Sequence, residues 1–270
     1  MTTGRGVGEV PVRLIPLGVG DAFSARHYTT CMALGAGDDW LLIDCPHPVR
    51  KMLREASEAA GVAIDLDAVV GVALSHLHAD HASGLEDFAY YSKFALGRRA
   101  RLAAHPDVLA RLWPNLLAAG MDRAVLTLDG EPTSMTRDDY FDATELATDP
   151  SATVAFGPFT LACRTTRHPI PTTAFRIDVA GRSIGFSADT AFDPDLIAWL
   201  APCDLILHET TARPASPVHT PYRDLASLPE PLRRKIRLFH YPDDFAPSPG
   251  APTPLRQGEL VPILPPAAGA

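Results

Sequence analysis

The feature that most constrains this chain is a run of four metal-binding side chains, His76, His78, Asp80 and His81, within six residues. It directly follows the apolar residues 69–74, whose length and composition predict a buried strand. Such a strand would deliver the four side chains to a loop at its carboxyl end. Imidazole and carboxylate are ligands that zinc prefers. The run therefore predicts a site for one divalent metal ion, or for two side by side; a chance gathering is disfavoured, because the whole chain has only ten histidines.

The spacing His-x-His-x-Asp-His after a hydrophobic strand resembles the signature of the metallo-β-lactamase fold superfamily. The later ligands of that family are a third histidine, a bridging aspartate and a final histidine, and His168, Asp189 and His240 stand in this order. The landmarks span residues 76–240, so the resemblance covers most of the chain. It implies an α/β fold, an αββα sandwich of two mixed sheets flanked by helices, with the metals at one edge between the sheets.

The resemblance also implies a dinuclear site. One metal ion would be held by His76, His78 and His168, the other by Asp80, His81 and His240, with Asp189 between them. Two such ions share a water molecule, lower its pKa and stabilise charge on the attacked centre, so the bridged hydroxide is the nucleophile and no Ser or Cys is required. We expect two divalent ions, with zinc as the default and manganese or iron as alternatives.

Three further motifs resemble the RNase Z and phosphodiesterase-like branch of the superfamily. Residues 187–190, Ser-Ala-Asp-Thr, are similar to its Ser-Gly-Asp-Thr, residues 207–210 to its His-Glu-Ala-Thr, and residues 219–220 to its His-Ser-Thr. The resemblance implies that Glu209 orients His219, which acts as the general acid, while Asp80 is essential for turnover. The alternative is that Glu209 ends a strand in hydrogen bonds and His219 is a loop residue; we expect His208 to be structural.

The chain departs from that branch in several places. Pro46 follows Asp44-Cys45 where the branch has glycine, and Ala188 also replaces a glycine. We expect Asp44 either to orient a ligand histidine or the first-turn loop, or to serve as a turn carboxylate. No Gly/Pro-rich arm of the RNase Z kind is evident. The four scattered cysteines form no Cys-x-x-Cys pair, which predicts reduced, buried thiols and excludes the extra cysteine-rich zinc site of some relatives.

The net charge of −8 argues against general electrostatic binding of nucleic acid. Two basic runs, residues 98–101 and 233–237, are either solvated faces or local basic patches. The amino terminus lacks the apolar core of a signal peptide, and no window reaches the roughly 18 apolar residues of a membrane span. We therefore expect a cytoplasmic protein that acts on a small-molecule substrate without a membrane partner, with a homodimer allowed.

Periodicity and turn residues predict one domain over residues 1–270, with a core at about 10–243 after a polar leader at 1–9. Residues 121–150 are expected to be an insertion, which is either a lid beside the site or a plain surface excursion. Residues 244–270 are Pro-rich, and 257–264 resemble the closing strand of the family. Strands are expected at 10–17, 31–34, 40–43, 69–74, 102–105, 153–156, 159–166, 174–179, 183–187, 205–207 and 236–239. Helices are expected at 49–56, 84–96, 106–118, 192–200 and 221–235, the last either continuous or broken at Pro229 and Pro231.

The function predicted is that of a metal-dependent hydrolase that uses a metal-bridged hydroxide on a small phosphodiester. The same site would serve hydrolysis of an ester, a thioester or a lactone, and RNA 3′-end cleavage is a further alternative. The non-enzymatic alternative is a metal-binding scaffold or sensor. Retention of all seven candidate ligands disfavours it.

Overall fold

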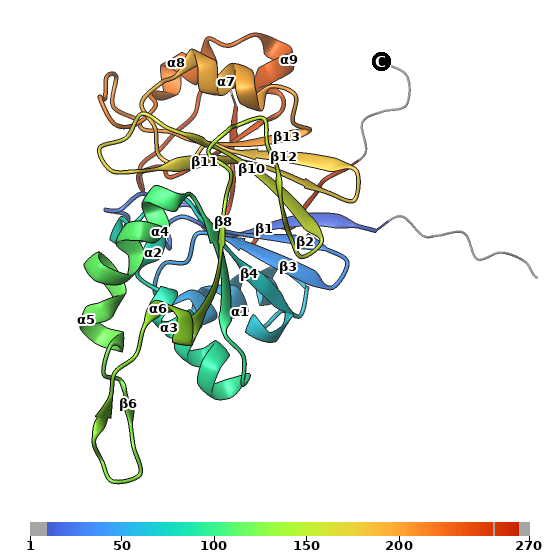
Figure 1. Cartoon of the computed structure of the whole chain (residues 1–270). Coiled ribbons are helices and arrows are strands. Elements are labelled where there is room, and N and C mark those ends of the chain that lie inside the picture. The colour runs from blue at the N-terminus through green and yellow to red at the C-terminus, as the bar shows by residue number, and fades with distance from the viewer. Residues whose placement is uncertain (1–9, 251, 265–270) are drawn as a thin grey trace, which may run out of the picture.

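Two seven-stranded sheets face each other, with helices on both outer faces, in the computed structural model of the chain (Figure 1). The structure describes residues 10–250 and 252–264. The leader expected at residues 1–9 and the last six residues of the Pro-rich segment lie outside the described residues. The αββα sandwich predicted from the sequence is confirmed.

The first sheet is mixed. Its order is β16-β1-β2-β3-β4-β5-β8, with antiparallel pairs from β16 to β3 and parallel pairs from β3 to β8. Within the span where we expect a closing strand, β16 pairs with β1. The strands are β16 (Val261–Pro262), β1 (Val12–Gly18), β2 (Cys31–Ala36), β3 (Asp39–Ile43), β4 (Val69–Leu74), β5 (Ala100–Ala104) and β8 (Phe141–Glu145).

The second sheet has the order β15-β14-β13-β12-β11-β10-β9, and it is parallel from β15 to β12 and antiparallel from β12 to β9. Its antiparallel part contains a hairpin turn between β11 and β12 at Gly181, which adopts a left-handed φ of 71°. The strands are β15 (Thr253–Pro254), β14 (Ile236–Phe239), β13 (Leu205–Glu209), β12 (Arg182–Phe186), β11 (Thr173–Val179), β10 (Phe159–Thr165) and β9 (Val154–Phe156).

Three apolar layers hold the sandwich together. Alternation along β3 explains the arrangement: Leu42 packs outward against the helices, whereas Leu41 and Ile43 pack between the sheets. Strands buried on both faces in this way give the continuous apolar runs seen in the sequence. Aromatic rings fill the middle layer, where Phe186 and Phe239 stack with centroids 4.8 Å apart.

The helices cover the two outer faces (Figure 1). Those on the first sheet are α1 (Val49–Ala60), η1 (Leu66–Ala68), α2 (Ala79–Ala82), α3 (Leu85–Tyr90), η2 (Tyr91–Ala95), α4 (Pro106–Leu112), η3 (Trp113–Leu117) and α5 (Ala118–Met121); those on the second are α7 (Pro194–Leu200), α8 (Tyr222–Ala226) and α9 (Glu230–Arg233). Proline opens α4 and α7, and left-handed Gly61 ends α1. None of the helices in the described part of the chain is long and apolar enough to span a membrane.

The segment 121–150 differs from the insertion expected there. It contains a two-stranded hairpin, β6 (Val125–Leu126) and β7 (Pro132–Thr133), which projects away from the sheets in Figure 1. After α6 (Arg137–Tyr140), however, the chain returns to form β8, the edge strand of the first sheet. Phe141, which is buried, is the first residue of this strand. The excursion is therefore shorter than predicted, because residues 141–145 belong to the first sheet.

Candidate metal centre

Four strands of the two sheets deliver the predicted ligands to one edge of the sandwich. His76 and His78 follow β4, and the next turn, α2, carries Asp80 and His81. The remaining ligands come from the second sheet: His168 follows β10, Asp189 follows β12 and His240 follows β14. The structure thus brings together all seven candidate ligands, as two clusters that share Asp189.

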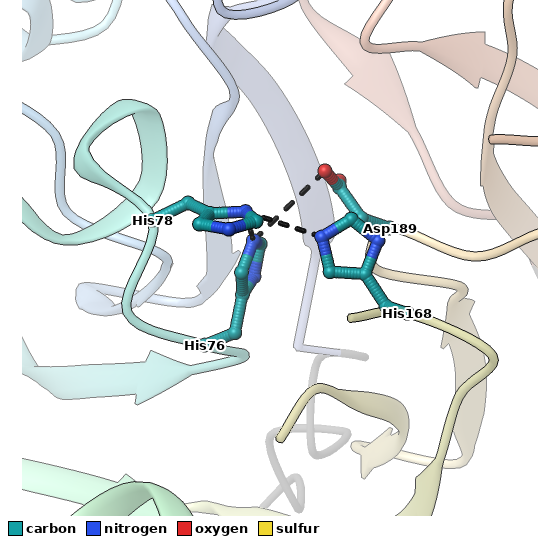
Figure 2. Close-up of side chains that lie close together, drawn as sticks. All are labelled: His76, His78, His168 and Asp189. Atoms are coloured by element: carbon teal, nitrogen blue, oxygen red, sulfur yellow. Dashed lines mark hydrogen bonds and ion pairs between the residues drawn. The ribbon is translucent and has the colours of Figure 1, made fainter. Parts of the chain in front are cut away.

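The first cluster consists of His76, His78, His168 and Asp189, whose ligand atoms all lie within 4.8 Å of one another. Figure 2 shows the three imidazole rings and the carboxylate converging on one point. Nδ1 of His78 lies 3.1 Å from Nε2 of His76 and 3.1 Å from Nε2 of His168. Nε2 of His76 is 3.9 Å from Oδ2 of Asp189. These four side chains form one inward-facing set of donors.

The second cluster consists of Asp80, His81, Asp189 and His240. Nε2 of His81 lies 3.3 Å from Oδ2 of Asp80 and 3.3 Å from Oδ1 of Asp189. Nε2 of His240 lies 3.3 Å from Oδ2 of Asp80 and 3.3 Å from Oδ2 of Asp189. The two carboxylates and two imidazoles therefore alternate around a common centre.

The donor separations fit divalent metal ions. With bonds of about 2.0–2.1 Å, the donors of a tetrahedral zinc site are about 3.3 Å apart. Two buried donor atoms, Nε2 of His81 and Oδ1 of Asp189, have no hydrogen-bond partner among the described residues. Buried polar atoms of this kind are costly unless something satisfies them. The residues present therefore fit the two-ion set that the sequence predicts.

Burial sets the protonation of the first cluster. Burial lowers the pKa of His168 to about 4, and it lowers the pKa values of His76 and His78 as well. All three rings are therefore neutral near pH 7. A neutral imidazole offers the lone pair that a metal ion requires.

The second cluster contains two carboxylates, those of Asp80 and Asp189. Burial opposes a charged imidazole at His240, yet the carboxylates of Asp189 and Asp80 raise its pKa to about 9. Burial likewise opposes ionisation of Asp80, but hydrogen bonds with His240 and His81 bring its pKa below the ordinary value. The carboxylate pair thus creates a local field that favours a cation.

Behind the clusters, buried Asp44 contacts the segment that carries His76 and His81. Its carboxylate accepts hydrogen bonds from the backbone N–H of Ser75 at 2.8 Å and from the Ser75 hydroxyl at 2.9 Å. It also lies 2.8 Å from Nδ1 of His81. Of the roles considered for Asp44, the structure supports orientation of a ligand histidine, because Nε2 of that ring is left to face the cluster.

A third group lies beside the shared edge of the clusters. Nδ1 of His219 is 3.2 Å from Oε1 of buried Glu209 and 4.0 Å from Oδ2 of Asp189. Oε1 of Glu209 also accepts from the backbone N–H of Thr190 at 2.8 Å. Burial opposes a charged His219, but Glu209 raises the pKa of the ring. This arrangement can keep a proton on His219 next to the candidate ligands.

Two other histidines, His208 and His105, lie apart from the clusters. Nδ1 of His208 is 2.7 Å from the carbonyl of Glu209, and burial lowers the pKa of this ring to about 4. His105 accepts from the backbone N–H of Asp107 and caps α4. Both rings therefore contact the local backbone and not the clusters.

Backbone strain is concentrated at the site. Three non-glycine residues at strand ends have left-handed φ angles: Asp44 at 63°, Ala188 at 50° and His240 at 55°. Such conformations cost about 1–3 kcal/mol each unless surrounding contacts impose them. Ala188 stands where the family motif has glycine, so the departure noted in the sequence has a direct conformational consequence.

One part of the site is not predicted from the sequence. A cavity of about 320 Å³ lies between residues 21–23 and 211–219, and His219 and His240 form part of its wall. The signal available was weak, because a Gly-Val-Gly-Asp turn before β2 indicates only a loop. The long-range contacts that place this loop beside His240 cannot be read from local patterns.

Comparison with known proteins identifies the family. A family model described as Anti-Pycsar protein Apyc1 matches residues 12–256. The chain belongs to the Anti-Pycsar protein Apyc1 family. It is 32% identical over 238 residues to an Apyc1 protein of Paenibacillus sp. (strain J14), covering 87% of this chain and 91% of that protein. It is also 30% identical to an Apyc1 protein of Bacillus phage BSP38, covering 85% and 88%.

Solved structures confirm the metallo-β-lactamase fold of this Apyc1 family member. The metallo-β-lactamase fold protein YhfI from Bacillus subtilis superposes with a TM-score of 0.67 at 18% identity, covering 87% of this chain and 88% of that one. Human tRNase Z, short form, gives 0.66 at 16% identity, with 93% and 99% covered. Zn²⁺-bound PqqB from Methylobacterium extorquens gives 0.65 at 14% identity, with 92% and 99% covered.

Proposed function

We propose that this protein is a metal-dependent hydrolase that cleaves a small phosphodiester. The observation that carries the proposal is the convergence of two donor clusters on Asp189, with the His219–Glu209 pair beside them. Membership of the Apyc1 family and the metallo-β-lactamase fold support an enzyme of this kind.

The residues of the clusters would hold two divalent ions, zinc being the first candidate. Bound there, the ions would lower the pKa of a water molecule and neutralise negative charge on the phosphate. Neutral His76, His78 and His168 suit one ion, and the carboxylates around His240 attract the other. Zn²⁺ bound to PqqB supports zinc for this fold.

His219 would donate the proton that the leaving oxygen requires. An alkoxide is a poor leaving group, so protonation of that oxygen accelerates cleavage of a phosphodiester more than cleavage of an activated ester. The pKa of His219, raised by Glu209, favours the protonated ring near neutral pH. A general acid in this position therefore favours phosphodiester over ester, thioester or lactone hydrolysis.

Size and charge favour a small substrate over RNA. The cavity beside His219, about 320 Å³, is at the small end of ligand sites in proteins. The chain carries a net charge of −8, which opposes a long polyanion. We also infer a reducing compartment such as the cytoplasm, because all four cysteines are free and buried.

A substrate panel tests the proposal. Zinc-loaded protein is assayed with bis-p-nitrophenyl phosphate, 3′,5′-cyclic nucleotides, an RNA with a 3′ extension, an ester and a lactone, each with and without chelator. We expect chelator-sensitive cleavage of the small diesters, lost in Asp80→Ala. Cleavage of the lactone or ester alone would indicate acyl chemistry, and binding without turnover of any substrate would indicate a scaffold or sensor.

A further inference from the structure

We propose that a cavity beside α9 and β15 binds a phosphate group, as inorganic phosphate or as the terminal group of a phosphomonoester. The cavity has a volume of about 410 Å³ and is lined by Glu230, Arg233, Arg234, Arg237, Gly250 and Thr253. The candidate metal ligands, Glu209 and His219 are not among these lining residues. This site goes beyond the proposed function, and its existence does not depend on that function.

The turn from α9 into β14 brings three arginines to one place. Arg233 ends α9, Arg234 follows it, and Arg237 is the second residue of β14. Arg237 pairs in register with Thr253 of β15, so the two side chains lie on the same face of the sheet. Lys235 differs, because its Nζ donates to the carbonyl of Ala201 at 3.1 Å. The arginines of the basic run 233–237 therefore share the wall of this cavity.

The wall carries more positive than negative charge. Three guanidinium groups face one carboxylate, that of Glu230, although the chain as a whole has a net charge of −8. Nε of Arg234 donates to Oε1 of Glu230 at 2.9 Å. Within residues 10–250 and 252–264, Arg233 and Arg237 have no carboxylate partner. Because like charges repel at this separation, a bound anion would stabilise the arrangement.

The protein leaves donors of both arginines unused. Nη1 of Arg233 donates to the carbonyl of Gly250 at 3.1 Å, which orients the side chain. Nε of the same residue is buried and has no hydrogen-bond partner among the described residues. Nη1 of Arg237 makes only long contacts, 3.4 Å to the carbonyls of Arg234 and Ile236. Guanidinium groups held in this way retain N–H donors for an oxyanion.

The arrangement favours phosphate over a carboxylate. A guanidinium binds either oxyanion through paired hydrogen bonds, so one arginine is enough for a carboxylate. A terminal phosphate has three acceptor oxygens and nearly two negative charges, and it can therefore accept from Arg233 and Arg237 together. The hydroxyl of Thr253, an exposed residue in register with Arg237, offers a further donor.

The site is separate from the donor clusters. Arg237 lies near the start of β14, and His240 follows the end of that strand. Three residues of extended chain correspond to roughly 10 Å. Backbone signals at the cavity and at His240 can therefore report independently on phosphate bound in the two places.

A residue-resolved NMR titration of the zinc-loaded, full-length protein tests the proposal. Inorganic phosphate and ribose 5-phosphate are added in separate experiments, and the amide signals of Gly250 and Thr253 report on the cavity. Both signals should shift and saturate with one dissociation constant for each ligand. A response to inorganic phosphate alone would identify the free ion as the ligand, and a response to both would include phosphomonoesters. Acetate that binds as tightly as phosphate would overturn the assignment of the ligand.

Arg237→Gln should raise the dissociation constant for phosphate about ten-fold, the effect expected for loss of one charge-assisted hydrogen bond. Arg233→Gln should have a similar effect. If the lost contact with Gly250 unfolds that variant, Arg237→Gln still provides the test. The matched control is Arg223→Gln, which removes the same charge from an exposed residue of α8 outside the cavity and should leave the constant unchanged. No saturating shift at Gly250 and Thr253, or equal weakening in Arg223→Gln, would overturn the proposal.

Discussion

Oδ2 of Asp44 lies 2.8 Å from Nδ1 of His81, and both side chains are fully buried. The two residues follow different strands of the first sheet, since Asp44 directly follows β3 and His81 lies in α2, after β4. The carboxylate fixes the orientation of the ring and leaves Nε2 facing Asp80 and Asp189. The second donor cluster therefore depends on a residue that does not itself belong to it.

Replacing Asp44 with asparagine should weaken metal binding at the second cluster. Asparagine keeps the shape but removes the charge that supports the basicity of His81. We expect metal affinity to fall by about ten-fold or more, the usual effect of losing such a partner. Competition with a chromophoric chelator measures it. Asp178→Asn, at an exposed carboxylate of β11, is the control, and an unchanged affinity in Asp44→Asn would refute the orienting role.

His219→Gln should separate proton donation from metal binding. Loss of a general acid should reduce turnover of an alkyl phosphodiester by about 100-fold or more. The reduction should be much smaller for a p-nitrophenyl phosphodiester, whose leaving group needs little protonation. The readouts are kcat for both substrates and metal content. Equal losses on the two substrates, with metal content unchanged, would contradict the general-acid role of His219.

Ala188→Gly should stabilise the fold, against the usual trend. A left-handed conformation costs a non-glycine residue about 1–2 kcal/mol, whereas glycine loses about 0.5–1 kcal/mol in backbone entropy. With φ at 50°, the net expectation is a gain of about 0.5–1 kcal/mol in the free energy of unfolding, measured by denaturant titration. Ala155→Gly, at an exposed position of β9, should instead destabilise the protein. A loss of stability in Ala188→Gly would mean that the β-carbon makes packing contacts that outweigh the strain.

The cysteine thiols should be unreactive in the native protein. Burial raises the pKa of Cys163 from 9.0 to about 11, and burial also raises the pKa values of Cys31, Cys45 and Cys203. Because the thiolate is the reactive form, a raised pKa keeps these groups protonated and inert at pH 8. Ellman's reagent should therefore modify none of the four native thiols at pH 8 and all four after unfolding in guanidinium. Rapid modification of a native thiol at pH 8 would contradict this burial.

The sequence predicts the elements that carry the ligands because their signals are local. Apolar composition predicts the strand before His76 and the strand before His240, and the ligand order follows from the family motif. The metal roles of these residues stay predictions. The structure adds how close the side chains lie. Nε2 of His240 is 3.3 Å from Oδ2 of Asp80, although the two residues follow strands of different sheets.

The features that escaped prediction depend on contacts distant in sequence. The Asp243 carboxylate accepts a hydrogen bond from the hydroxyl of Ser24, 219 positions earlier in the chain, and no periodicity predicts that pair. Likewise, β8 pairs with β5 after a long excursion, so an edge strand was expected to be an insertion. Similarly, no helix or strand is expected at residues 21–28, although residues 21–23 border the candidate site.

The most direct test of the central claim is a metal titration of the metal-free protein, with bound metal and cleavage of bis-p-nitrophenyl phosphate measured on the same samples. Two clusters that share Asp189 predict that bound zinc saturates at two ions per chain and that activity reaches its maximum only as the second ion binds. A protein that binds no zinc in the titration, or that is fully active without metal, would contradict the account.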